Sequence, residues 1–205
     1  MGNTKAQTVW LYHFTNIENL STIIQNGLMC DSLLEEGKYI NSGDSSIKAR
    51  RKGIPVPFGG YVANYVPFYF AARSPMLYRQ HYTGTIENEH IVYLISSTEI
   101  FVSSKTPWCC SNMNAACNDA EFFNTVEEMN TNIKWDYINS RYWCNTDEHP
   151  RRREYRMAEF LVWNKIPWAD IPYLAVFNDA ASERVKKILP EGSKQRIFVK
   201  QDMYF

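Results

Sequence analysis

The segment Tyr65-Val-Pro-Phe-Tyr-Phe-Ala-Ala-Arg-Ser-Pro-Met-Leu77 combines a dense run of aromatic residues with an arginine and two prolines. It follows neither the 3.6-residue period of a helix nor the strict alternation of a half-buried strand. The aromatic rings offer flat faces for a planar ligand, and Arg73 offers a fork of donors that suits phosphate. The segment therefore suggests the wall of a binding pocket, although on composition alone a hydrophobic strand followed by a turn is the commoner interpretation.

The sequence on either side of this segment predicts a mixture of strands and helices. A first strand over residues 9–14 is ended by Asn16, whose side chain can cap a helix over 17–25. Residues 37–60 are rich in glycine, serine, proline and lysine, and we expect a long mobile loop there. Other strands are expected over 62–70, 91–96, 159–163, 174–177 and 196–200, and other helices over 74–78, 119–129 and 179–189. The mixture predicts the α+β class, with a central, mostly antiparallel sheet flanked by helices.

The composition is that of an ordinary globular protein. The chain has 205 residues, of which 45% are hydrophobic and 21% charged, and we expect a single domain over residues 1–205. The chain contains no run of about 18 apolar residues that would span a bilayer, and residues 1–7 lack the apolar core of a signal peptide. We therefore expect a cytoplasmic monomer with no membrane partner.

The cysteines are an odd set of five without a C-x-x-C pair, which is typical of reduced thiols. Cys109, Cys117, Cys144 and His149 are conceivable zinc ligands, but their spacing matches no standard ligand pattern. We expect no metal.

The formal net charge is zero, so no overall field attracts this protein to nucleic acid, and any such binding has to be local. Two short basic clusters are candidates, although such clusters are most often solvated turns. The clusters are Lys48, Arg50, Arg51 and Lys52, and Arg151, Arg152, Arg153 and Arg156.

Three blocks of this sequence resemble the DarT family of bacterial toxins, which use NAD to ADP-ribosylate DNA bases. The first block is Tyr12-His-Phe-Thr-Asn-Ile-Glu-Asn-Leu20 with Asn26-Gly-Leu28, and the second is Val66-Pro-Phe-Tyr-Phe with Arg73-Ser-Pro-Met-Leu77. The third is Arg156-Met-Ala-Glu-Phe-Leu-Val162. The resemblance implies a fold similar to that of poly-ADP-ribose polymerase-like transferases, NAD as a substrate, and transfer without a metal.

The resemblance also implies roles for individual residues. Glu159 is expected to stabilise the positive charge that develops on the ribose when the bond to nicotinamide breaks. Tyr69 or Phe70 is expected to stack on nicotinamide, and Arg51 to hold the NAD phosphates and assist the attacked base, with Arg50 as the competing assignment. The remaining ligand-side polar groups implied by the first block are His13, Thr15 and Asn19.

For the acceptor, the resemblance implies single-stranded DNA and, in the cell, an antitoxin that removes ADP-ribose from DNA through a macrodomain or similar fold. The loop Ser111-Asn-Met-Asn-Ala-Ala-Cys117 departs from the acidic, histidine-containing sequence expected of thymine-modifying members. Because base selection depends on the groups that this loop presents, the departure leaves two acceptor bases open, with thymine favoured and guanine as the alternative. An NAD-consuming RNA 2′-phosphotransferase and a non-enzymatic nucleic-acid-binding module are the competing function classes. The expected DNA contacts are Arg73, Asn114, Arg151, Arg152 and Arg153.

Overall fold

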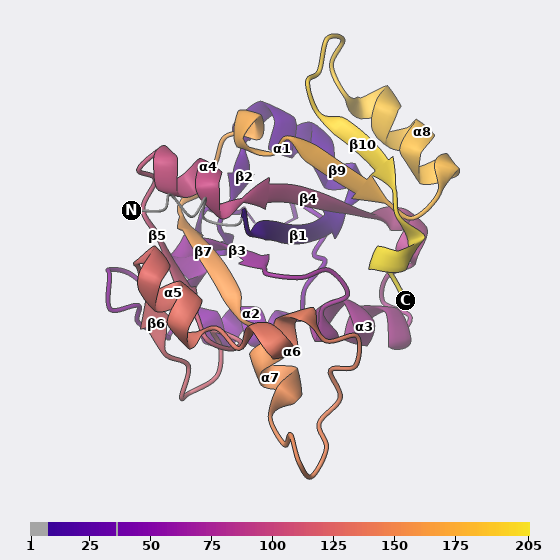
Figure 1. Cartoon of the computed structure of the whole chain (residues 1–205). Helices are drawn as coiled ribbons and strands as arrows, with labels where there is room; N and C mark the ends of the chain where they lie inside the picture. Colours follow the sequence, from indigo (N-terminus) through magenta and orange to yellow (C-terminus); the bar gives the residue numbers. More distant parts are fainter. Residues whose placement is uncertain (1–7, 36) are drawn as a thin grey trace, which may run out of the picture.

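The computed structural model describes residues 8–35 and 37–205, so the signal-peptide expectation for residues 1–7 lies outside the described residues. An eight-stranded sheet in the order β10-β9-β4-β1-β3-β7-β5-β6 forms its centre (Figure 1). All neighbouring strands pair antiparallel except β9 and β10. The α+β prediction is therefore confirmed. The strands are β1 (Trp10–Asn16), β3 (Tyr65–Tyr69), β4 (Ile91–Ser97), β5 (Trp108–Ser111), β6 (Phe122–Phe123), β7 (Glu159–Trp163), β9 (Tyr173–Val176) and β10 (Arg196–Val199), and β2 (Leu28–Met29) pairs separately with β8 (Lys165–Ile166).

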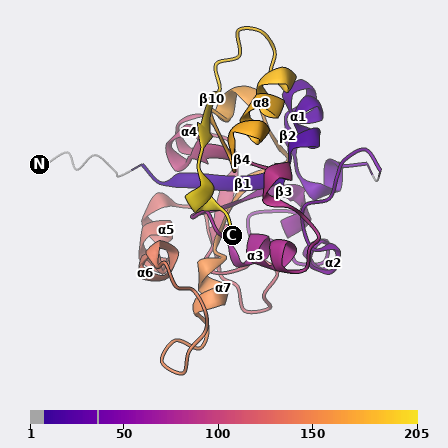
Figure 2. The ribbon, with the colours of Figure 1, turned by 90° about the vertical axis from the view of Figure 1, so that its right-hand side faces the viewer.

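Helices pack on both sides of this sheet. In the view turned by 90°, α1 and α2 lie on one side, whereas α4, α5 and α6 lie on the other (Figure 2). None of the helices in the described part of the chain is long and apolar enough to cross a membrane. The helices are α1 (Leu20–Asn26), α2 (Ser45–Arg51), α3 (Pro75–Tyr82), α4 (Thr98–Ser103), α5 (Val126–Asn132), α6 (Trp135–Asn139), α7 (Arg152–Arg156) and α8 (Asp179–Ile188).

Alternation along β1 divides the core between the two faces of the sheet. Leu11 belongs to a large cluster that includes residues of α1 and α8, whereas Phe14 packs with Met76 and Leu77 of α3 and with Tyr93. Successive side chains of a strand point to opposite faces, so both faces of this central strand are used for packing.

Two expected elements differ from those observed. Residues 37–60, expected to be loop, contain α2, because Asp44 accepts hydrogen bonds from the backbone N–H groups of Ser46 and Ile47 and so caps a new helix. The helix expected over 119–129 begins only at Val126. The residues before it form β6, which pairs with β5, a strand that the sequence patterns did not indicate.

Candidate active site

A cavity opens where the central strands β1 and β3 separate. The two strands pair only at Tyr12 and Tyr69, whereas β1 pairs with β4 over its whole length. Beyond that point the side chain of His13, not the backbone, contacts the carbonyl oxygen of Pro67, at 2.8 Å from Nδ1. The cavity is closed on its other sides by α1, by the segment leading into α2, and by Asn114 and Glu159.

Glu159 and Arg51 form a buried ion pair at the inner end of this cavity. Arg51 Nη1 lies 2.7 Å from Glu159 Oε2, and the two side chains are 7% and 1% exposed. The other carboxylate oxygen, Oε1, accepts a hydrogen bond of 3.0 Å from the Ala115 backbone N–H. Burial alone would lower the pKa of Arg51, but the adjacent Glu159 charge outweighs it and the pKa lies above its usual value. The Arg51 guanidinium is therefore held charged, and its contact with Glu159 fixes its orientation.

One donor of this pair is left open. Arg51 Nη2 is buried and has no hydrogen-bond partner within the described chain. A buried donor without a partner is costly, so this guanidinium nitrogen is suited to an acceptor that arrives with a ligand. Arg50, the competing assignment, instead bonds the carbonyl oxygen of Ala116 at 2.7 Å and the side chain of Asn118 at 3.2 Å. Of the two arginines, only Arg51 contacts Glu159 and lines the cavity.

Tyr69 lies directly opposite Glu159 in the β3–β7 pair, so both side chains belong to one face of the sheet. Its ring lies nearly parallel to that of Phe14, with centroids 6.4 Å apart. Burial and the neighbouring Glu159 charge raise the pKa of the phenol, which therefore stays protonated. The cavity thus has an aromatic wall beside its carboxylate.

His13 is neutral and has one defined tautomer. Burial lowers its pKa to about 4. Because the Pro67 carbonyl oxygen can only accept, Nδ1 carries the proton and Nε2 is left as an acceptor. An imidazole in this state accepts a hydrogen bond from a hydroxyl group.

Thr15 and Asn19 also line the cavity, but they bond to each other and to the chain. Asn19 Nδ2 donates to Thr15 Oγ1 at 2.9 Å, and the Asn19 amide exchanges two hydrogen bonds of 2.8 Å with the backbone of Ile40. Asn19 therefore fastens the segment before α2 over the cavity.

Of the other residues expected at the site, Asn114 lines the cavity and Phe70 does not. Asn114 lines the cavity together with Glu159. Phe70 does not line it: the ring is buried among Trp135 and Phe160 in the main core. The expectation for Phe70 is corrected, because successive residues of a strand face opposite sides and Tyr69 takes the cavity side.

The arginines expected to contact DNA lie outside the cavity. Arg151 forms an ion pair with Asp119, and one of its nitrogen–oxygen distances is 3.0 Å. Arg152 lies over the Tyr137 ring at 5.6 Å, and Arg153 is exposed. Arg73 has a positive φ of 53° and lies over the ring of Phe205 at 4.6 Å.

A second ion pair at the cavity was not expected from the sequence. Lys48 Nζ lies 2.8 Å from Asp31 Oδ1 and 5.0 Å from the centre of the Tyr39 ring, and all three residues line the cavity. The basic cluster around Lys48 was visible in the sequence, but its acidic partner lies in another segment. Only the packing of α2 against the residues after β2 brings them together.

The four side chains considered as zinc ligands are not grouped. Cys109 is buried in β5, whereas Cys144 is exposed. Within residues 8–35 and 37–205, no group of three or more histidine, cysteine, aspartate or glutamate side chains is placed to hold a metal ion.

Known proteins that this chain resembles over its whole length, in sequence and in fold, place it in the class of ADP-ribosyltransferases. The model of the family described as "ssDNA thymidine ADP-ribosyltransferase, DarT" matches residues 12–205. The chain belongs to the DarT family and is a DNA ADP-ribosyltransferase. The resemblance of the three motifs is confirmed, and the non-enzymatic and RNA phosphotransferase alternatives are set aside.

Relatives match over the full length. The DNA ADP-ribosyl transferase of Thermus sp. (strain 2.9) is 34% identical over 214 residues that cover both chains completely. That of Mycobacterium tuberculosis is 32% identical and covers 96% of this chain and 89% of its own. The structure of Thermus sp. 2.9 DarT in complex with ADP-ribosylated ssDNA superposes with a TM-score of 0.88 over both whole chains at 33% identity. The same protein in complex with NAD+ gives a TM-score of 0.83 at 32% identity, over 98% of this chain and all of its own.

Proposed function

We propose that this protein transfers ADP-ribose from NAD to a thymine base of single-stranded DNA and releases nicotinamide. The observation that carries the proposal is the buried Arg51–Glu159 pair, which lies inside a cavity with an aromatic wall and a neutral histidine. The Thermus sp. 2.9 DarT complexes with NAD+ and with ADP-ribosylated ssDNA support it.

Each part of NAD finds a suitable group in the cavity. His13 Nε2 accepts a hydrogen bond from a ribose hydroxyl, and the Tyr69 ring stacks on nicotinamide and orients the leaving group. The cations Lys48 and Arg51 suit the diphosphate. Thr15 and Asn19 line the cavity wall, and Asn19 holds the segment before α2 in place through its hydrogen bonds to the Ile40 backbone.

The reaction replaces one bond at the ribose C1′ with another. The bond from C1′ to the nicotinamide nitrogen breaks and nicotinamide leaves with the electron pair, so positive charge spreads over C1′ and the ring oxygen. The Glu159 carboxylate stabilises this charge. A thymine ring nitrogen then bonds C1′ and its proton passes to Glu159. Arg51 acts through its charge and its open Nη2 donor, because an arginine with a raised pKa does not serve as a base.

The acceptor base is assigned to thymine because the family description specifies thymidine, and guanine is the alternative. Asn114 lines the cavity together with Glu159 and can bond a base edge, whereas Arg73, Arg152 and Arg153 do not line the cavity and are proposed to contact the DNA backbone. Arg151 also does not line the cavity, and its guanidinium is paired with Asp119. Mass spectrometry of oligonucleotides that contain a single thymine or a single guanine distinguishes the two bases.

We also propose that the activity is toxic and is reversed by an enzyme that removes ADP-ribose from DNA. A fusion protein of Thermosipho africanus is described as a DNA ADP-ribosyl transferase-DNA ADP-ribosyl glycohydrolase. It is 24% identical, and the match covers 87% of this chain and 45% of the fusion. Expressing the chain with and without such a hydrolase tests the proposal: growth is expected to stop only without it.

The central test replaces Glu159 with glutamine. Glu159→Gln removes the charge but keeps a partner for Arg51, whereas alanine would leave a buried arginine unpaired. Transfer is expected to fall about a hundredfold or more, because losing one preorganised electrostatic group typically costs that much. Modification of the oligonucleotide is measured by mass spectrometry. Glu183→Gln, at an exposed pair with Lys186, is the control and keeps its rate. A Glu159→Gln variant as active as the original would overturn the assignment.

A further inference from the structure

A group of aromatic rings lies on the surface where α3, the loop between α6 and α7, and the C-terminal residues meet. Tyr78 is at its centre, with ring centroids 5.8 Å from Tyr82, 5.4 Å from Trp143 and 5.1 Å from Phe205. These four residues are called the aromatic platform below. Tyr78 is 40% and Tyr82 78% exposed. Tyr82 is therefore largely open to solvent, and Tyr78, Trp143 and Phe205 are partly open.

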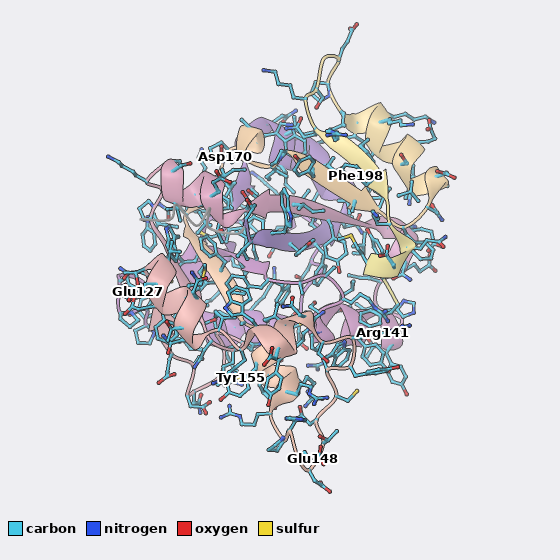
Figure 3. All side chains as sticks on the ribbon, viewed as in Figure 1. Glu127, Arg141, Glu148, Tyr155, Asp170 and Phe198 are labelled. Atoms are coloured by element: carbon cyan, nitrogen blue, oxygen red, sulfur yellow. The ribbon has the colours of Figure 1, made fainter. Side chains whose placement is uncertain are left out.

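The platform is bordered by arginines. Arg73 lies over the Phe205 ring at 4.6 Å, and its Nε is buried without a hydrogen-bond partner in the described chain. Arg141 is exposed and is two residues before Trp143. Trp143 of the same loop contacts Tyr78 of α3, and the acidic Glu148 lies at the tip of this loop (Figure 3). Two arginines thus lie near the rings, although the chain as a whole carries no net charge.

The platform is connected to the cavity through α3. Met76 on this helix lines the cavity, and Tyr82 follows it by six residues, which is about 9 Å along a helix axis. Arg156 Nη2 donates to the Ala72 carbonyl oxygen at 2.9 Å, and Asn114 Nδ2 lies 3.8 Å from Met157 Sδ. The residues leading to the platform are thus held against those that reach Glu159.

We propose that the aromatic platform binds the nucleotides that flank the target base, with the unpaired bases stacked on Tyr82 and Trp143 and the phosphates beside Arg73 and Arg141. The inference rests on the proposed function, since it adds a substrate-binding surface to that same site. Exposed aromatic rings interleaved with arginines are how proteins hold single strands without reading their sequence. A duplex hides the faces of its bases, so the same surface also favours single strands.

Equilibrium binding without NAD tests the proposal. A labelled oligonucleotide of about ten nucleotides with one thymine is titrated with Tyr82→Ala and with Trp143→Ala, and affinity is followed by fluorescence anisotropy. Each substitution is expected to weaken binding about tenfold, which is typical for the loss of one stacked base. Tyr82→Phe keeps the ring and restores the affinity. In steady-state transfer the effect falls on KM for DNA and not on kcat, because the platform does not touch the reacting atoms.

Phe198→Ala is the matched control. Phe198 is 36% exposed on β10 and also has an arginine over its ring, Arg196 at 5.6 Å, but it lies outside the platform. The affinity of the Phe198→Ala variant for DNA is expected to differ less than twofold from that of the original protein. Melting temperatures of all variants show whether the fold is kept.

Two outcomes would overturn the inference. The first is unchanged affinity in folded Tyr82→Ala and Trp143→Ala. The second is a change in sedimentation without a change in DNA affinity, which would make the platform a protein contact. Neither depends on catalysis, because the affinity for DNA is measured without NAD. Failure of the platform is therefore distinguishable from failure of the proposed chemistry.

Discussion

Arg51 and Arg50 are neighbours in sequence, yet their surroundings differ completely. Arg51 is buried and paired with Glu159, whereas Arg50 reaches the loop at Ala116 and Asn118. On a helix, adjacent side chains point about 100° apart, so only one of the pair can enter the cavity. The charge and the fork geometry of Arg51 both matter, because its Nη1 donates a hydrogen bond to Glu159 while its Nη2 remains available to a ligand.

Replacing each arginine by lysine separates the two roles. Arg51→Lys is expected to lower ADP-ribose transfer about a hundredfold, because a point charge on a flexible stem cannot reproduce the two-sided contact. Arg50→Lys is expected to lower it less than fivefold. Transfer rates at saturating NAD, read by mass spectrometry of the oligonucleotide, provide the comparison. Equal losses of transfer rate in the two variants would contradict the specific role of Arg51 at the cavity.

At the scale of elements, the cavity depends on how α1 ends. Gly27 terminates α1 with φ of +83° and lines the cavity. A Cβ there would lie 2.7 Å from the carbonyl oxygen of Ile166, a backbone atom of β8. Glycine therefore serves two purposes at this position: it permits the left-handed conformation and it lets β8 approach the helix end.

Gly37 allows these two effects to be separated. It has nearly the same φ, +81°, but a Cβ there meets nothing within 4 Å. Gly37→Ala is expected to destabilise the fold only through the unfavourable positive φ. Gly27→Ala is expected to destabilise it through the same φ and also through the clash with Ile166. The free energy of unfolding, measured by urea denaturation, is expected to fall by about 1–3 kcal/mol more in Gly27→Ala. A smaller loss in Gly27→Ala than in Gly37→Ala would contradict the close approach of β8.

At the scale of the whole molecule, the absence of net charge decides how DNA is recognised. The chain has 22 basic and 22 acidic side chains, so long-range attraction to a polyanion is weak. We therefore expect binding to come from local contacts, which we propose at the cavity, the aromatic platform and the arginines around it. Such contacts require bases that are already unpaired.

Single strands are therefore expected to be modified at least tenfold faster than duplexes of the same sequence. Extruding a base from a duplex costs a few kcal/mol, and this protein has no excess positive charge to offset that cost. Initial rates on matched single- and double-stranded oligonucleotides at one salt concentration provide the measurement. Equal rates would show that the protein opens duplex DNA.

The family and most of the strands could be predicted from the sequence alone, and Glu159 was proposed from it as the catalytic carboxylate. These follow from local information: β-branched runs predict strands, Asn16 and Gly27 bound a helix, and the motif around Glu159 lies within one short segment. Which side chains come into contact at the cavity depends on the tertiary structure. Arg51 and Glu159 are 108 residues apart, and Tyr69 rather than Phe70 faces them because of the register between β3 and β7. A one-residue shift would reverse that choice, and register is set by packing across the sheet, which no local pattern specifies.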